Sequence, residues 1–199
     1  MIVISNPTVA KNEIKIIHTL FDQGLMSFHI RKFHFSEDQM KSYLSAIGLE
    51  YNNRLVLHSH HQLAEESGIT RIHLTEKTRI ETSEETLRKW KERAFKLSTS
   101  IHSMTDFEQL SHAFDYAFFG PVFESISKPN YVSNLDFKSA LEKRKNNNTA
   151  LIALGGITPN NVKIALQYGF DDVALLGTMW NSNNPIENFI LCQQIVHLH

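Results

Sequence analysis

Residues 115–129 read DYAFFGPVFESISKP, and the other parts of the chain can be placed around this stretch. Tyr116–Phe119 is a short apolar, aromatic run that stops at Gly120-Pro121, which predicts a buried strand that ends in a turn. Two hydroxyls and an ammonium follow, on Ser125, Ser127 and Lys128. Such a loop at the C-terminal end of a strand suits a phosphorylated ligand, although serine and lysine are also common in solvated turns.

Two later strands are predicted to end in glycine. Residues 151–154 form an apolar run closed by Gly155-Gly156, and residues 172–176 form a strand-like run that ends at Gly177. Backbone N–H groups approach an oxyanion closely where no Cβ intrudes, and a helix N-terminus adds partial positive charge. We therefore expect Gly155, Gly156 and Gly177 to bind a phosphate. A branched residue at Gly155 is expected to block that approach without unfolding the chain.

The chain has 199 residues, which predicts one domain over 1–199. Its formal net charge is -1, with 20 basic and 21 acidic residues, and no block of like charge marks a face for nucleic acid or a membrane surface. A small-molecule partner is expected instead. The single cysteine, Cys192, has no partner for an internal disulfide, and no apolar run approaches the length of a membrane span. A cytoplasmic location is therefore expected.

Apolar, strand-like runs alternate with helical patterns eight times along the chain. The expected strands are 1–5, 26–31, 54–58, 70–74, 97–101, 116–119, 151–154 and 172–176. The expected helices are 11–21, 36–47, 62–66, 83–95, 106–113, 136–145, 161–167 and 187–197. Such alternation predicts an α/β protein with a parallel sheet, and eight units predict a closed (β/α)8 TIM barrel. An open doubly wound sheet is the alternative, but no G-x-G-x-x-G follows the first strand, so nucleotide cofactors are not suggested.

Histidines gather at the predicted C-terminal ends of strands two to five, where barrel enzymes keep their chemistry. These ends carry His29 and Arg31, His58 and His60, His73, and His102. They are expected to face one mouth of the barrel. Three interpretations stay open: a zinc site, a neutral polar pocket that hydrogen-bonds a heteroaromatic ligand, and unrelated surface histidines. The polar pocket is favoured and no metal is assigned, because no H-x-x-x-H or His-carboxylate spacing fixes two ligands on one rigid element.

Several motifs in order resemble the thiamine phosphate synthase/TenI superfamily, and the resemblance covers essentially the whole chain. They are FHIRK at 28–32, RIHL at Arg71–Leu74, STSIHS at 98–103, GPVFESISKP at 120–129, ALGGIT at 153–158 and the turn at Gly177. The resemblance implies that Arg31, Ser125, Ser127 and Lys128 hold the pyrophosphate of a pyrimidine substrate. It also implies that the glycine turns after strands seven and eight hold thiazole phosphate, a small phosphorylated heterocycle.

The chain departs from the synthases of this family at three positions. Ser59 and Thr78 stand where the synthases carry two Mg²⁺-binding aspartates, and Phe33 stands where they carry a lysine. A departing pyrophosphate would be poorly stabilised without that metal and that cation. No cofactor is therefore expected, and Mg²⁺ is expected only if the chain is a synthase, with Glu76 as a carboxylate from a shifted register.

The retained thiazole phosphate side resembles TenI, whose members isomerise thiazole carboxylate phosphate to its aromatic tautomer without metal. Glu124 supports this, but TenI proteins place a catalytic histidine where this chain has Pro121. The proton must then be moved by His102, His73, His58 or His29. The leading expectation is a TenI-like thiazole tautomerase; thiamine phosphate synthase and a non-catalytic thiazole phosphate sensor are the alternatives. A homodimer and a monomer are both left open.

Overall fold

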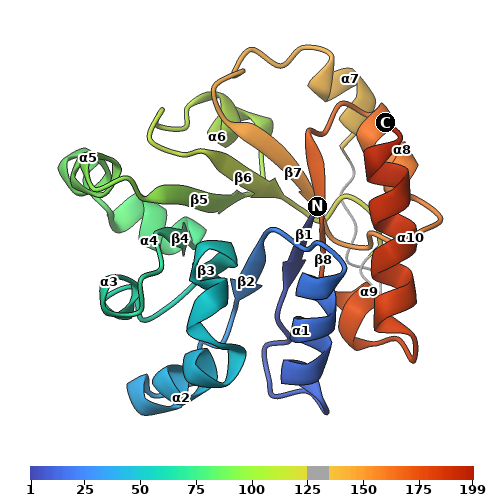
Figure 1. The fold of residues 1–199 in the computed structure, drawn as a ribbon. Coiled ribbons are helices and arrows are strands. Elements are labelled where there is room, and N and C mark those ends of the chain that lie inside the picture. Colours follow the sequence, from blue (N-terminus) through green and yellow to red (C-terminus); the bar gives the residue numbers. More distant parts are fainter. Residues whose placement is uncertain (125–134) are drawn as a thin grey trace.

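The structure, a computed structural model, describes residues 1–124 and 135–199. Eight parallel strands form a closed barrel in which each strand pairs with the next and β8 pairs with β1. Figure 1 shows these strands at the centre and the helices around them. The predicted (β/α)8 TIM barrel is confirmed, and the open doubly wound alternative is wrong. Ser125, Ser127 and Lys128 lie outside the described residues.

The strands are short and follow the predicted apolar runs. They are β1 (Ile2–Ile4), β2 (Phe28–Ile30), β3 (Leu55–Leu57), β4 (Arg71–Leu74), β5 (Lys96–Ile101), β6 (Tyr116–Phe119), β7 (Ala150–Leu154) and β8 (Asp172–Leu175). The helices are α1 (Glu13–Asp22), α2 (Glu37–Ile47), α3 (Leu63–Glu66), α4 (Glu76–Glu81), α5 (Glu84–Glu92), α6 (Met104–Glu108), α7 (Phe137–Leu141), α8 (Val162–Gln167), α9 (Gly177–Trp180) and α10 (Pro185–His197), with a 3-10 turn η1 (Leu49–Arg54). Each strand therefore has a helix between it and the next, as a barrel requires.

Side-chain caps explain where several helices begin. Ser36 forms a capping box with Gln39 at the start of α2, and Ser83 caps α5, as the sequence indicated. The prediction of a helix over 106–113 was wrong at both ends, because Ser103 accepts a hydrogen bond from the Asp106 amide and starts α6 early. The prediction over 136–145 was too long. Helices α4 and α9 were not predicted.

Successive residues of each strand point alternately outward, toward the helices, and inward, into the barrel. The outward residues of every strand, such as Phe28, Leu57 and Ala153, pack with the helices in one large core. The inward residues of β1, β6, β7 and β8 form a second, smaller core inside the barrel: Ile2, Ile4, Phe118, Ile152 and Ala174. This alternation follows from the pleat of the strands and fills the barrel with side chains.

The inward residues of the other half of the barrel are mostly polar, although Val56 on β3 is apolar. His29 on β2 and Ser98 on β5 are fully buried, and His73 on β4 is 1% exposed. Tyr116, at the start of β6, closes this half of the interior through a hydrogen bond of 2.7 Å between its hydroxyl and His29 Nε2. One half of the barrel interior is thus apolar and the other half is a hydrogen-bonded polar network.

A buried ion pair joins the first residue of α1 to the chain just after β2. Lys32 Nζ lies 2.7 and 2.8 Å from the two carboxylate oxygens of Glu13 and 2.7 Å from the carbonyl oxygen of Thr8. Both side chains are almost completely buried, and the ammonium lies over the rings of Phe35 and Tyr43. Lys32 is therefore a structural residue. In the described part of the chain, no helix is long and apolar enough to cross a membrane.

We predict that Glu13→Ala destabilises the protein by about 3–5 kcal/mol, because it leaves the Lys32 ammonium buried without its counter-charge. Urea unfolding measures the change. The matched control is Glu66→Ala, which removes an exposed carboxylate 3.3 Å from Lys41 and should cost less than about 1 kcal/mol. Equal effects of the two substitutions would contradict a structural role for the buried pair.

Candidate functional site

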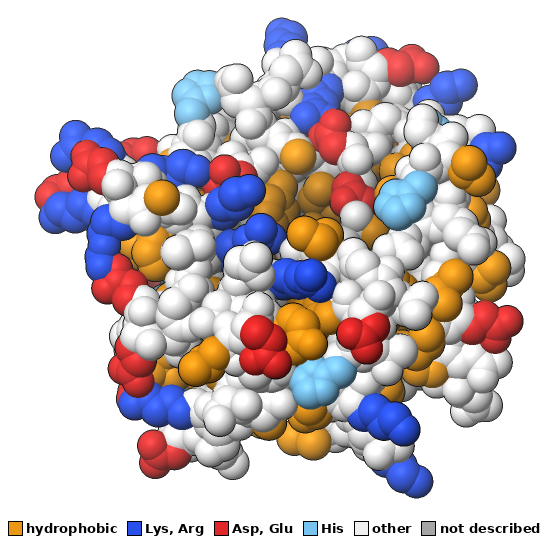
Figure 2. Space-filling model, in the orientation of Figure 1, with side chains coloured by type: hydrophobic (Ala, Val, Ile, Leu, Met, Phe, Trp, Pro, Cys, Tyr) orange, Lys and Arg blue, Asp and Glu red, His pale blue; other side chains and the backbone are white. Residues whose placement is uncertain are grey.

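A cavity of about 910 Å³ opens at the C-terminal ends of the strands. Its wall includes Arg31 and Phe33 after β2, Glu76 in α4, His102 after β5, and Gly156 and Gly177 after β7 and β8. Figure 2 shows hydrophobic side chains recessed at the centre of one face, with basic side chains beside them. A large concave site at the C-terminal face is where barrel enzymes bind their ligands.

The glycine pair after β7 packs tightly against the chain that follows β6. Gly155 and Gly156 have φ values of 97° and 67°, which favour glycine. A Cβ on Gly155 would lie 2.8 Å from Pro121 Cα, and a Cβ on Gly156 would lie 2.4 Å from the carbonyl oxygen of Glu124. A branched residue at Gly155 would therefore have to displace the backbone at Pro121, so we now expect it to disturb the fold as well as the approach of a phosphate.

Three glycine amides of this region have no partner in the described part of the chain. Gly155, Gly156 and Gly177 all line the cavity, and within residues 1–124 and 135–199 none of their amides has a hydrogen-bond acceptor. Asn161 fixes the first turn, because its Nδ2 donates to the Gly156 carbonyl at 2.8 Å and its Oδ1 accepts from the Thr158 amide at 2.8 Å. Fixed N–H groups at a glycine turn suit a phosphate.

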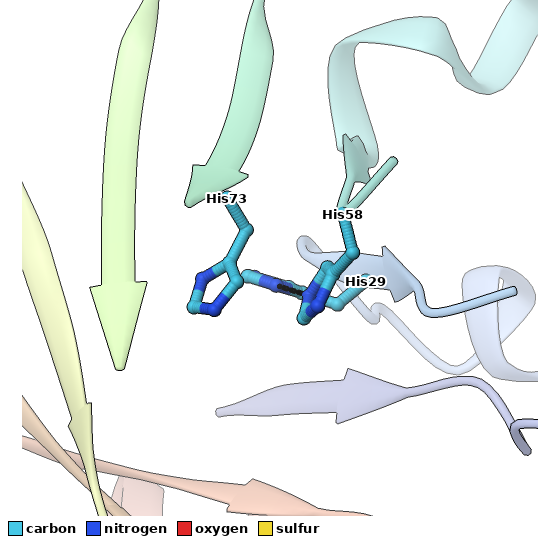
Figure 3. A group of neighbouring side chains, drawn as sticks. All are labelled: His29, His58 and His73. Carbon is cyan, nitrogen blue, oxygen red and sulfur yellow. Dashed lines mark hydrogen bonds between the residues drawn. The ribbon is translucent and has the colours of Figure 1, made fainter. Parts of the chain in front are cut away.

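The buried histidines form a cluster rather than a set of mouth residues. His29 Nδ1 and His58 Nε2 share a hydrogen bond of 2.8 Å, and the rings of His58 and His73 stack with centroids 4.0 Å apart (Figure 3). His58 and His73 line the cavity. The expectation that all the histidines face the mouth is wrong for His29, which is fully buried beneath them, and His60 points to the Phe35 carbonyl.

The cluster is neutral over the ordinary pH range. Burial lowers the pKa of His29 and of His58 well below the usual value, and the neighbouring His73 and arginines lower both further. Burial, with His61 and Arg31 nearby, lowers the pKa of His73 to about 3. Because a conjugate acid with so low a pKa gives up its proton readily, His73 is a weak base near neutral pH.

His102 differs from the cluster in its exposure and hydrogen bonding. Its ring is exposed at the cavity wall, and Nδ1 lies 2.8 Å from the carbonyl oxygen of Gly120. A carbonyl only accepts, so Nδ1 carries a proton and the lone pair of neutral His102 lies on Nε2. Of the four predicted histidines, His102 is therefore the one with an accessible basic nitrogen.

In the described part of the chain, Arg31 and Lys77 are basic residues on the cavity wall. The Arg31 guanidinium lies 5.0 Å from the centroid of the Phe33 ring, and burial lowers its pKa from the usual value. Ser59 and Thr78 are not among the residues on the cavity wall in the described part of the chain. Thr78 bonds instead to the Thr75 hydroxyl at 2.9 Å. Glu76 remains as a carboxylate on the wall.

Barrel and cavity together define a (β/α)8 protein with a large cavity at the C-terminal face, where barrel enzymes bind their ligands. A family model described as thiamine monophosphate synthase, TMP-TENI, matches residues 1–179. The chain belongs to this thiamine monophosphate synthase/TenI family. The motifs at the strand ends thus identified the family correctly.

Individual relatives carry the synthase name. The chain is 37% identical over 70 residues to a thiamine-phosphate synthase of Nitrosococcus oceani, which is 35% of this chain and 32% of that protein. It is 34% identical over 82 residues to one of Prochlorococcus marinus, which is 41% of this chain and 23% of that protein. The matched segments therefore span less than a third of either relative.

Solved structures show the same architecture. A thiamine phosphate pyrophosphorylase of Bacteroides thetaiotaomicron is 28% identical, with a TM-score of 0.79 over 100% of this chain and 98% of that chain. One from Pyrococcus furiosus is 17% identical, with a TM-score of 0.77 over 99% of this chain and 95% of that chain. The second likeness concerns the fold alone.

We predict that inorganic phosphate binds at the Gly156 and Gly177 amides, which are oriented toward an anion by the turns after β7 and β8. In an NMR titration these two resonances should shift together and saturate. The amides of Gly24 and Gly48, which also have positive φ but lie outside the cavity wall, should not shift. Shifts confined to residues outside the cavity would contradict the assignment.

Proposed function

We propose that this chain is a TenI-like enzyme that isomerises a thiazole carboxylate phosphate to its aromatic tautomer. The observation that carries the proposal is a contrast within the cavity. Glycine amides suited to a phosphate are present, whereas the positions of the two Mg²⁺-binding aspartates, Ser59 and Thr78, carry hydroxyls and lie off its wall. A chain so equipped suits a reaction that needs an anchored phosphate but no departing pyrophosphate.

The proposed reaction is a proton transfer with no net loss or gain of atoms. One proton leaves a ring carbon of the substrate, and a proton returns at another position of the same π system. The substrate phosphate is held by the Gly156 and Gly177 amides, which fixes the heterocycle in the cavity. His102 Nε2 accepts the proton and then donates it back.

His102 is chosen over the other three predicted histidines on physical grounds. The lowered pKa values of His29, His58 and His73 make these rings weak bases. The second nitrogen of His102 is held as a donor by the Gly120 carbonyl, which orients the ring and selects its tautomer. The buried rings then serve as a neutral polar floor of the cavity.

Thiamine phosphate synthase is the second candidate. The names of the relatives from Nitrosococcus oceani and Bacteroides thetaiotaomicron favour it, as does the presence of Arg31 and Glu76 on the cavity wall. In that reaction the pyrophosphate would be met by Arg31, and Mg²⁺ would depend on Glu76. One carboxylate is at the lower limit of what Mg²⁺ bound to a substrate's phosphates takes from a protein. A non-catalytic sensor is the outcome if neither reaction occurs.

We predict that His102→Gln lowers the tautomerase rate by about two orders of magnitude or more, the usual contribution of a positioned acid or base. The melting temperature should change by no more than a few degrees, because the side chain is exposed. His112→Gln is the matched control, since His112 is also exposed but lies outside the cavity wall. A full rate in His102→Gln would remove the proton-transfer role from this residue.

We also predict that the purified protein forms no thiamine phosphate above background when Mg²⁺, the pyrimidine pyrophosphate and thiazole phosphate are supplied together. Glu76→Gln should leave the tautomerase rate unchanged, as should Glu81→Gln at the other end of α4. Synthesis that requires Mg²⁺, and that is lost in Glu76→Gln but not in Glu81→Gln, would contradict the isomerase and establish the synthase.

A further inference from the structure

The three buried histidines of the barrel interior have a geometry that the proposed reaction does not use. They come from β2, from the residue after β3, and from β4, so the barrel itself sets their positions (Figure 3). Each of His29, His58 and His73 offers a ring nitrogen, and these three nitrogens lie within 4.8 Å of one another. We propose that they form a binding site for one divalent first-row transition metal ion, such as Zn²⁺ or Co²⁺.

The type of ligand selects the class of ion. Neutral imidazole suits Zn²⁺, Co²⁺, Ni²⁺ and Cu²⁺, whereas Mg²⁺ prefers oxygen ligands. All three side chains are buried. The His29–His58 hydrogen bond places a proton on one of its two nitrogens, so that proton must move to the other nitrogen of its ring before both nitrogens can bind the ion. Three histidines with a fourth position left for water or a ligand are a known arrangement of zinc in enzymes.

The outer hydrogen bonds are those that metal-bound histidines usually make. His29 Nε2 lies 2.7 Å from the Tyr116 hydroxyl, and His73 Nδ1 lies 2.9 Å from Ser98 Oγ. Ser98 Oγ donates to the Ile72 carbonyl at 3.4 Å, which leaves it free to accept from His73. Two of the three rings thus have an oxygen partner for one nitrogen, which leaves the other as a metal ligand.

The rings must rearrange to hold one ion, because His58 and His73 are stacked with an interplanar angle of 22° and have to tilt apart before their lone pairs converge. Tetrahedral zinc with bonds of about 2.0–2.1 Å places its ligand nitrogens about 3.3 Å apart. The His29–His58 pair is closer than that, at 2.8 Å, while the most distant nitrogens of the cluster are 4.8 Å apart at most. The ion would replace the His29–His58 hydrogen bond and the bond of 3.1 Å between His73 Nε2 and Ser100 Oγ.

Charge and access set the expected behaviour of the site. Arg31 and Arg71 both act on the cluster with positive charge, which weakens binding of a cation relative to an isolated trihistidine site. His58 and His73 line the cavity, so an ion can reach these two rings from it. Neither His102 nor the glycine amides belong to this site, and the proposal therefore does not depend on the isomerisation.

The test is titration of Co²⁺ into protein freed of metal with EDTA. We expect one equivalent to bind with the intense visible absorption of a four-coordinate Co²⁺ ion, and Zn²⁺ to displace it, whereas Mg²⁺ has no effect. X-ray absorption of the Zn²⁺-loaded protein should show three imidazole nitrogens at about 2.0–2.1 Å. A weak six-coordinate spectrum, mainly oxygen ligands, or no binding would overturn the proposal, and these measurements need no variant.

Variants locate the ion. His58→Gln and His73→Gln should lose the visible absorption, whereas His102→Gln, in the same cavity, and His112→Gln, on the surface, should keep it. Tyr116→Phe preserves the ring but removes the oxygen bonded to His29, and should weaken Co²⁺ binding about 10- to 100-fold. Loss of absorption in His102→Gln or His112→Gln with retention in folded His73→Gln would also overturn the proposal.

Discussion

Closure of eight parallel strands into a barrel is the constraint on which the rest of this structure depends. Closure sends alternate residues of each strand inward and brings all the C-terminal strand ends to one mouth. The inward side chains must then fill a small interior, and this chain fills half of it with Ile4, Phe118 and their neighbours. It fills the other half with polar side chains such as His29 and Ser98 that must satisfy one another. The cavity lies above this divided interior.

The division of the interior explains why the buried histidines and His102 have different chemical properties. Imidazoles inside the barrel lose their hydration, so burial lowers their pKa and they act as neutral hydrogen-bonding groups. His102 at the rim keeps contact with water and has one nitrogen fixed by a carbonyl. In the proposed function His102 therefore transfers the proton. The proposed metal ion would bind the neutral rings inside the barrel. The glycine turns contribute in a third way: Gly155 and Gly156 pack tightly on the chain after β6, and Gly156 and Gly177 line the cavity.

Much of the fold was predictable from local sequence, because short apolar runs that end in glycine or proline specify strands and turns without reference to distant residues. The strand ends, the barrel and the glycine turn at Gly155 were found in this way. The inward direction of the His29 side chain could also have been predicted. Successive residues of a strand point to opposite faces, and its neighbours Phe28 and Ile30 are apolar and pack outward. The buried ion pair of Glu13 and Lys32 could not have been predicted. The two residues are 19 positions apart, and no sequence pattern links them. The reason for glycine at 155 was likewise hidden, since it depends on contact with Pro121 from another strand end.

The central claim is that this cavity binds a thiazole phosphate through backbone amides and without Mg²⁺. Isothermal titration calorimetry of thiazole phosphate, carried out once in EDTA and once in excess Mg²⁺, tests it most directly. We expect one binding event per chain with the same affinity in both buffers, because in the proposed function the Gly156 and Gly177 amides bind the phosphate. Binding that appears only with Mg²⁺, or only after the pyrimidine pyrophosphate has bound, would contradict it.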